Sequence, residues 1–222
     1  MQPYIEENAM DSEGLNNQIG MQKDHIAERL HIAAVIDFLS RTKEYDSLTV
    51  SEICQHAKIS RTSFYRLFAD KYDAANWYMF QVLDAGNTLT GRNYTWYEGN
   101  LITLSGCMLM KDLMGSAWKS AGYYAMKETG IRKKYEEMVT TITQYKNLEL
   151  TDELRFQCDS FAYIESYVVR TWIREKEPRT VEEMASYIDH IVPPQLHELL
   201  NKPIDPKPAE KLTLGSLVLA IS

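Results

Sequence analysis

The stretch 49-TVSEICQHAKISRTSFYRLFADKYDAANWY-78 decides the fold, because it contains start signals for three consecutive helices. Thr49 and Glu52 have the spacing of a capping box, in which each residue binds the backbone amide of the other. Ser60 is a good N-cap for a second helix after a short break, and Asp70 for a third. The stretch therefore predicts two short helices joined by a tight turn and followed by another helix.

The second of these helices has one apolar and one polar side at 100° per residue. The apolar side, which we expect to pack inward, consists of Phe64, Leu67 and Phe68. The polar side consists of Thr62 and Arg66, with Arg61 and Tyr65 at its flanks. A pair of short helices whose second member presents such a polar side is typical of a helix-turn-helix, in which that member enters the major groove of DNA.

Charge is unevenly distributed along the chain. The 222 residues include 31 acidic and 24 basic side chains, which give a net charge of −7. Residues 58–71 nevertheless carry four basic side chains and one acidic side chain. A basic island in an acidic protein is a candidate contact for an anion such as the DNA backbone.

The rest of the chain also reads as helical, because apolar residues recur every three or four positions and strand alternation is missing. The fold class that we predict is all-α, with a helix-turn-helix domain before a larger helical domain. We expect helices at about 23–40 and 153–176, and a last helix over 181–200 that Pro193-Pro194 kinks or divides. The predicted division is a flexible segment 1–22, a DNA-binding domain 23–70, an effector-binding and dimerisation domain 71–202, and a tail 203–222.

The same stretch resembles the DNA-binding domain of the tetracycline-repressor (TetR) family of bacterial transcriptional regulators. The resemblance covers about residues 25–78 and is carried by T-V-x-x-I at 49–53, I-S at 59–60, F-Y-x-x-F at 64–68 and Lys71. It implies a dimeric, cytoplasmic, ligand-responsive regulator, a repressor that binds a pseudo-palindromic operator. Lys58 stands where the family often has glycine, which predicts a less tight turn, and Leu67 stands where the family commonly has a polar residue.

The resemblance also implies which residues contact DNA. Lys71 would bind phosphate at the start of the helix that follows the helix-turn-helix. Arg61 and Thr62 would set the sequence preference, and Tyr65 would contact the backbone. The full DNA-binding set that we predict is Thr49, Ser60, Arg61, Thr62, Ser63, Tyr65, Arg66 and Lys71.

A methionine-rich and aromatic segment at 101–128 is a candidate effector pocket. Flexible, polarisable methionines beside planar rings suit a small apolar or aromatic molecule. The predicted effector-binding residues are Met108, Met114, Trp118, Tyr123 and Tyr124. Ordinary core packing explains each of them equally well. A second stripe, Phe161, Ile164, Val168 and Trp172, suits helix packing against either the protein's own core or a partner.

Motifs for catalysis are missing from the sequence. It has no nucleophile elbow, glycine-rich phosphate loop, kinase signature or paired metal ligands, so we predict no enzyme activity, no cofactor and no metal. Cys54, Cys107 and Cys158 are far apart and are expected to be buried free thiols. The apolar run 212–222 is too short to span a bilayer, so no membrane partner is expected.

The predicted partners are thus double-stranded DNA, a second copy of the chain and a small apolar or aromatic effector. Two alternatives remain open from the sequence. One is an all-α enzyme or protein-interaction module in which the basic island is only a solvated surface. The other is a DNA-binding relative of the family that needs no small ligand and responds to a protein partner.

Overall fold

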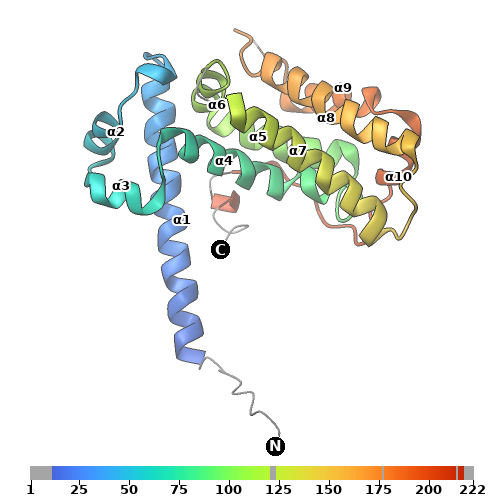
Figure 1. Cartoon of the computed structure of the whole chain (residues 1–222), viewed down its shortest axis with the longest axis horizontal. Coiled ribbons are helices and arrows are strands. Elements are labelled where there is room, and N and C mark those ends of the chain that lie inside the picture. Colours follow the sequence, from blue (N-terminus) through green and yellow to red (C-terminus); the bar gives the residue numbers. More distant parts are fainter. Residues whose placement is uncertain (1–11, 121–123, 177, 214, 218–222) are drawn as a thin grey trace, which may run out of the picture.

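A computed structural model describes residues 12–120, 124–176, 178–213 and 215–217, with the backbone alone for 12–24 and 124–127 (Figure 1). Within these residues there is no β-strand, which confirms the all-α prediction. The helices are α1 (Ser12–Ser40), α2 (Val50–Ala57), α3 (Arg61–Leu67), α4 (Lys71–Ala85), α5 (Trp96–Leu109), α6 (Lys111–Ala117), α7 (Tyr124–Thr140), α8 (Asp152–Trp172), α9 (Val181–Ile191) and α10 (Pro194–Leu200). Shorter turns are η1 (Tyr45–Ser47), η2 (Asn87–Leu89) and the π-helical η4 (Thr141–Tyr145).

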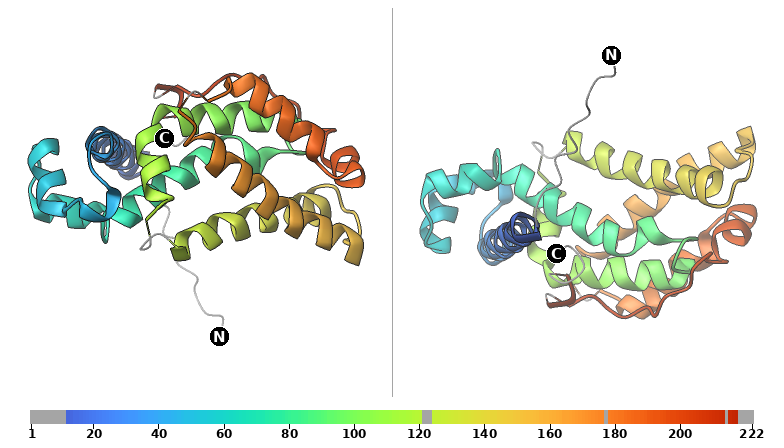
Figure 2. Two further views of the ribbon diagram at one scale, coloured as in Figure 1. Left: turned by 90° about the horizontal axis from the view of Figure 1, so that it is seen from above. Right: turned by 90° about the horizontal axis from the view of Figure 1, so that it is seen from below.

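The helices form two packed groups joined by α4. We call α1–α3 the head and α5–α10 the body. In Figure 1, α2 and α3 lie on one side of α1 and the body lies on the other, and both views of Figure 2 agree. Helix α4 packs against α1 in the head and against α5 in the body, while α6 packs against α1. The head is therefore connected to the body through α4 and α6.

The start signals of the head helices are largely confirmed. The Ser60 hydroxyl accepts the Ser63 amide at 2.9 Å, and the Asp70 carboxylate accepts the Asp73 amide at 2.9 Å. The predicted capping box at Thr49 is only half formed. Its hydroxyl accepts the Glu52 amide at 3.2 Å, but the Glu52 carboxylate pairs with the Lys43 ammonium instead of returning to the cap.

The turn between α2 and α3 is closed although lysine replaces glycine. Lys58 has φ 56° and ψ 40°, the left-handed conformation that glycine adopts most easily. The next amide, that of Ile59, donates to the Cys54 carbonyl at 3.1 Å, which ends α2 in a compact turn. The substitution of lysine at this position therefore does not loosen the turn as the sequence predicted.

Some helix boundaries differ from the predicted ones. Helix α1 begins at Ser12, earlier than the start predicted near residue 23, and α8 ends at Trp172 rather than near residue 176. The predicted division of the last helix is confirmed: α9 ends at Ile191 and α10 begins at Pro194. Proline has no amide hydrogen to continue a helix, but it suits the first position of a new one.

Large side chains fill a continuous core. Phe64 and Phe68 of the head are buried beside α1, and Trp96 packs edge-on against Phe161 in the body with 5.3 Å between ring centroids. All three cysteines are free and buried, as predicted. Burial of such rings and aliphatic chains contributes about 1.5–3 kcal/mol each to stability.

The segment after α10 packs back along the body. The Asp205 amide donates to the Arg92 carbonyl at 2.8 Å, and the Lys207 amide donates to the Asn93 carbonyl at 3.1 Å. Further on, the Leu212 amide donates to the Ser105 hydroxyl at 2.7 Å, and the Leu212 side chain is buried. The described part of the predicted tail thus packs against the residues before α5 and against α5 itself.

Candidate DNA-binding surface and effector cavity

Helix α3 is held to the head by its apolar side and exposes its polar side. Phe64 and Leu67 are buried, whereas Arg61, Thr62 and Tyr65 are exposed. The inward and outward sides that the sequence predicts for α3 are therefore confirmed. Leu67, which occupies a position that is often polar in similar proteins, belongs to the core here and cannot reach DNA.

The exposed N-terminal part of α3 carries a cation next to a phenol. The Arg61 guanidinium approaches the Tyr65 hydroxyl at 3.5 Å and lies 5.9 Å from the centre of its ring. One turn earlier, the Ser60 and Ser63 hydroxyls are 3.0 Å apart. Because the Ser60 oxygen also caps the helix, its first role is to fix the start of α3.

Two of the predicted DNA-binding residues have additional structural partners. The Arg66 guanidinium donates to the Glu28 carboxylate of α1 at 3.0 Å, so it ties α3 to α1. This pair is exposed on both sides and contributes little stability, about 0–1 kcal/mol. Thr49 is exposed at the start of α2, and its hydroxyl is used as the N-cap.

The sequence predicts that the ammonium group of Lys71 contacts a DNA phosphate, but in the structure this group points into the protein. Its side chain is buried, and Nζ donates to the carbonyls of Tyr45, Asp46 and Leu48 at 2.7, 2.8 and 2.7 Å. Three acceptors use all three donors of an ammonium group. Burial lowers the pKa of Lys71. This lysine therefore fixes the turn before α2 onto the start of α4, and the predicted phosphate contact is wrong for its side chain.

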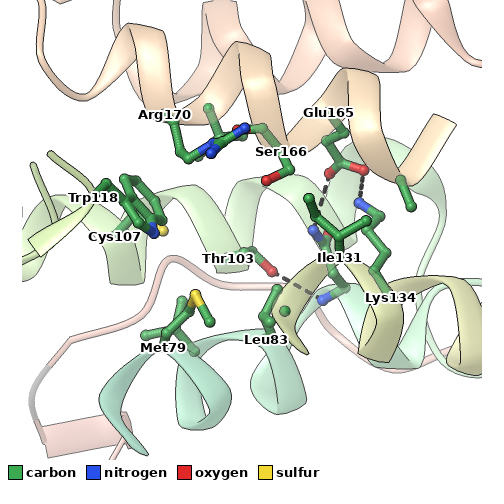
Figure 3. Close-up of a pocket in the computed structure, with 15 residues that line it drawn as sticks. Met79, Leu83, Thr103, Cys107, Trp118, Ile131, Lys134, Glu165, Ser166 and Arg170 are labelled. Atoms are coloured by element: carbon green, nitrogen blue, oxygen red, sulfur yellow. Dashed lines mark hydrogen bonds and ion pairs between the residues drawn. The ribbon is translucent and has the colours of Figure 1, made fainter. Parts of the chain in front are cut away.

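A cavity lies in the body between α4, α5, α7 and α8 (Figure 3). Its apolar wall consists of Met79, Val82, Leu83, Cys107, Trp118, Ile131, Ala162 and Val169, and Gly130 adds backbone. Its polar residues are Asn87, Thr103, Lys134, Glu165, Ser166 and Arg170. The cavity volume is about 70 Å³, whereas pockets for drug-sized ligands measure roughly 300–1,000 Å³. The cavity is therefore closed to all but the smallest molecules in this conformation.

A buried ion pair closes one end of the cavity, with Trp118 and Cys107 at the other end (Figure 3). The Lys134 ammonium pairs with the Glu165 carboxylate, and both side chains are buried. The Asn87 amide donates to the second Glu165 oxygen at 3.0 Å. Burial lowers the pKa of Lys134 well below its usual value. A buried ion pair of this kind is costly to break from one side.

Among the predicted effector-binding residues whose side chains the structure describes, Trp118 lines the cavity and the two methionines do not. Met114 is buried in the core, and Met108 is half-buried without reaching the cavity, so both predictions are corrected. Cys107 faces the cavity, and Met108, about 100° further around α5, does not. Tyr123 and the side chain of Tyr124 lie outside the described residues. The residues missed by sequence reasoning come mostly from α4, α7 and α8.

Residues 39–73, which contain α2 and α3, match the family model for bacterial regulatory proteins of the tetR family. The head carries a TetR-type DNA-binding motif. This finding confirms the resemblance that the sequence motifs predict. It also supports a role in transcription regulation. Comparison with curated protein sequences gave no match.

Two solved structures share the fold of this chain. One is the dihydroxyacetone kinase operon activator DhaS, with a TM-score of 0.58 and 18% identity over 79% of this chain and 99% of the other. The other is a tetR-family transcriptional regulator from Streptomyces coelicolor, with a TM-score of 0.52 and 15% identity over 73% of this chain and 79% of the other. At these identities the likeness establishes the fold and no more.

Helix α6 and the residues after it connect the cavity wall to the TetR-type head. At the start of α6, the Asp112 and Leu113 amides donate to one oxygen of Asp37 in α1, at 3.0 and 2.9 Å. After α6, the Ser120 hydroxyl donates to the carboxylate of Asp46, whose backbone carbonyl accepts a hydrogen bond from the buried Lys71 ammonium. Trp118 lies between these two contacts and lines the cavity. A change in the cavity can thus reach the head at two points.

No described helix is long and apolar enough to cross a membrane. Among the described side chains, no group of three or more histidine, cysteine, aspartate or glutamate residues is placed to hold a metal ion.

The cavity thiol provides a chemical probe. Burial raises the pKa of Cys107 to about 12 and that of Cys158 to about 11. At pH 8, a thiol with a pKa near 12 is about one part in ten thousand thiolate, the reactive form. We therefore expect no measurable reaction of the native protein with a disulfide reagent within minutes, and three equivalents after unfolding in urea. Rapid labelling of Cys107 in the native protein would show that the cavity is open.

Proposed function

We propose that the protein is a TetR-type transcriptional repressor that acts in the cytoplasm. It binds a pseudo-palindromic operator as a homodimer and releases the operator when a small apolar or aromatic molecule enters the cavity of the body. The proposal rests mainly on the orientation of α3. Buried Phe64 and Leu67 fix this helix to the head, and Arg61, Thr62 and Tyr65 are exposed on its other side. Such a rigid, polar helix fits the major groove, where arginine binds guanine in a bidentate manner.

Substitutions on α3 test this assignment. Arg61→Ala and Thr62→Ala are expected to relax sequence preference, with about 1–3 kcal/mol less discrimination between operator and unrelated duplex for the arginine. Tyr65→Phe is expected to weaken all duplexes to a similar extent, because a backbone contact is independent of sequence. Fluorescence anisotropy with labelled duplexes measures both effects.

Arg132→Ala is the matched control for Arg61→Ala, since Arg132 is an exposed arginine of the body in a weak pair with Glu136. It should leave DNA binding unchanged. If Arg61→Ala and Arg132→Ala reduced the discrimination between operator and unrelated duplex equally, α3 would not be the helix that recognises the DNA sequence.

An exposed apolar surface on the body supports the homodimer. Phe156 and Tyr167 of α8 are 71% and 65% exposed, and Ile164 of α8 with Tyr187 and Ile191 of α9 are about half exposed. Phe161 and Trp172 of the predicted stripe pack inside the chain, whereas Ile164 faces outward. Covering these side chains with the same surface of a second copy would remove them from water and place two heads side by side.

Charged substitutions on this surface are expected to separate the dimer. The double variant Tyr167→Glu, Ile191→Glu places carboxylates where an interface would bury them, so it should be a monomer at micromolar concentration in light scattering. It should also bind the operator at least about tenfold more weakly, because each head then binds alone. Ile204→Glu is the control, since Ile204 is 51% exposed on the segment after α10. A wild-type monomer that binds a palindrome tightly would contradict the proposal.

The small cavity supports a switch in which the ligand selects a wider body. A ligand with several carbon atoms can enter only if α7 and α8 separate from α4 and α5, so it binds a different conformation from the closed one. That movement shifts Trp118 and α6, and with them the contacts to Asp37 and Asp46 in the head. Operator affinity must then fall by the same factor by which operator DNA weakens the ligand.

Tryptophan fluorescence tests this switch, because Trp118 lines the cavity. Titration of a library of small aromatic molecules, with and without operator duplex, should identify ligands whose affinity falls when the duplex is present. Trp118→Phe should remove most of the optical signal and keep the coupling. A ligand that binds in the cavity and leaves operator affinity unchanged would contradict the proposed switch.

A further inference from the structure

A second, polar groove lies where the head meets the body. It is bounded by the end of α1 and the residues after it, by α6 and Lys119 beyond it, and by residues 173–176 after α8. The groove has a volume of about 460 Å³ and shares no residue with the cavity of the body. Its basic residues are Arg41, Lys43, Lys111, Lys119, Arg174 and Lys176, and its acidic residues are Glu44, Asp112 and Glu175.

Existing ion pairs neutralise only part of this charge. Arg41 lies 3.3 Å from the carboxylate of Asp112, and Lys43 pairs with Glu52 outside the groove. Glu175 in turn is occupied by Arg179, whose guanidinium lies 3.1 Å from it. Two of the three acidic residues are thus already paired with arginines.

Among the described residues, no carboxylate pairs with the remaining basic side chains of the groove. Lys111 donates to the backbone carbonyl of Glu175, at 3.4 Å. Lys119, Arg174 and Lys176 form no ion pair with any described carboxylate. Glu44 is the one acidic residue of the groove lining that is left to offset the charge of these three residues and Lys111. The groove therefore keeps an excess of positive charge in a protein whose net charge is −7.

We propose that this groove binds a small polyanion of the phosphate class, such as a diphosphate or a phosphorylated metabolite. Lysine ammoniums and an arginine guanidinium are the groups that recognise phosphate oxygens, the first as point charges and the second in a bidentate manner. The volume falls within the range of pockets for small ligands. The groove presents these groups from two segments of the body, residues 111–119 along and after α6 and residues 173–176 after α8, so a ligand in it can contact cations from both segments.

Operator DNA is a poorer occupant of the groove. Helix α6 lies on the opposite side of α1 from α2 and α3, as Figures 1 and 2 show from different directions. A duplex bound by α3 therefore runs along the far side of the head. The excess charge of the groove is left for a separate anion.

The position of the groove implies a consequence for regulation. Arg41 and Lys43 belong to the head, whereas Lys119, Arg174 and Lys176 belong to the body. An anion that binds Lys119 and Arg174 and also reaches Arg41, in competition with its carboxylate partner Asp112, holds the two parts in one relative orientation. Lys119 also follows directly after Trp118 of the cavity wall, so the groove anion and the cavity ligand act on the same segment.

Direct binding of sodium pyrophosphate, measured by titration calorimetry at constant ionic strength and without DNA, tests the site. We expect saturable binding of one pyrophosphate per chain. The double variant Lys119→Gln, Arg174→Gln should weaken it by about tenfold or more, because two charge-assisted contacts are lost. Both side chains are exposed, so the variant should fold normally, which thermal unfolding would verify.

The control variant Arg132→Gln, Lys202→Gln removes the same net charge from exposed positions of the body, outside the groove. It should bind pyrophosphate as the wild type does. Ribose 5-phosphate in place of pyrophosphate distinguishes an organic phosphate from an inorganic one, and saturable binding of either supports the proposal.

Three results would overturn it. One is the absence of saturable binding of both probes at millimolar concentrations. Another is equal weakening in the groove variant and the control variant, which would indicate attraction by net charge alone. The third is displacement of pyrophosphate by a short unrelated duplex, which would make the DNA backbone the occupant. None of these measurements depends on the operator, so they are separate from the tests of the proposed repressor.

Discussion

Lys71→Met is expected to destabilise the head by about 3–5 kcal/mol, since removal of the ammonium leaves buried carbonyls without a donor. Nζ of Lys71 binds three carbonyls in the segment 45–48, which lies before α2. Methionine keeps a similar length and apolar stem but cannot donate a hydrogen bond. Urea unfolding followed by circular dichroism should show the loss, and DNA binding should disappear together with the folded head.

The opposite pattern is expected if Lys71 instead bound phosphate. Stability would then stay unchanged, and the slope of log affinity against log salt would fall in magnitude by about 1 per half-site. Arg61→Met is the matched control, because Arg61 is an exposed cation of the same head. It should leave stability within about 0.5 kcal/mol and alter only DNA binding. A fully stable Lys71→Met protein would refute the structural role of this lysine.

Glu165→Ala is expected to have the second large effect, about 3–5 kcal/mol of lost stability. The substitution leaves the Lys134 ammonium buried without its carboxylate partner, 5.9 and 5.6 Å from the ring centres of Trp96 and Phe161. It also removes the acceptor of the Asn87 amide. Thermal unfolding measured at pH 7 would give the size of the loss.

Lys134→Met in the Glu165→Ala background should restore most of that stability, because no unpaired charge remains in the body. The four proteins of this double-mutant cycle give the coupling energy of the pair. Ser166→Ala is a suitable control, since Ser166 also lines the cavity but carries no charge. Additive losses from the two single substitutions would show that the two groups are not coupled.

The head could be predicted well from sequence because its signals are local. The caps at Ser60 and Asp70 act within three residues, and the alternation of Phe64 and Leu67 with polar residues fixes which side of α3 is buried. The role of Lys71 could not be predicted in the same way. Its three acceptors lie 23 to 26 residues earlier, and only the folded turn brings them together.

The cavity and the groove show why sites of the body were harder to predict. Lys134 and Glu165 come from different helices, α7 and α8, so no spacing in the sequence relates them. A charged Glu165 inside the apolar run FAYIESYVV was the one local signal for a buried polar site. The methionines near residue 110 are close in sequence but lie on several sides of α5 and α6, so most of them pack into the core.

The most direct test of the central claim is selection of bound duplexes from a random pool by the purified full chain, followed by sequencing. We expect enrichment of a palindrome whose half-sites are about 34–36 Å apart, or a multiple of that distance. The same selection with Arg61→Ala should yield a palindrome with altered or relaxed bases within each half-site. If the wild-type protein enriched no palindrome, or if Arg61→Ala enriched the same one with equal strength, the proposed reading of DNA by α3 would be contradicted.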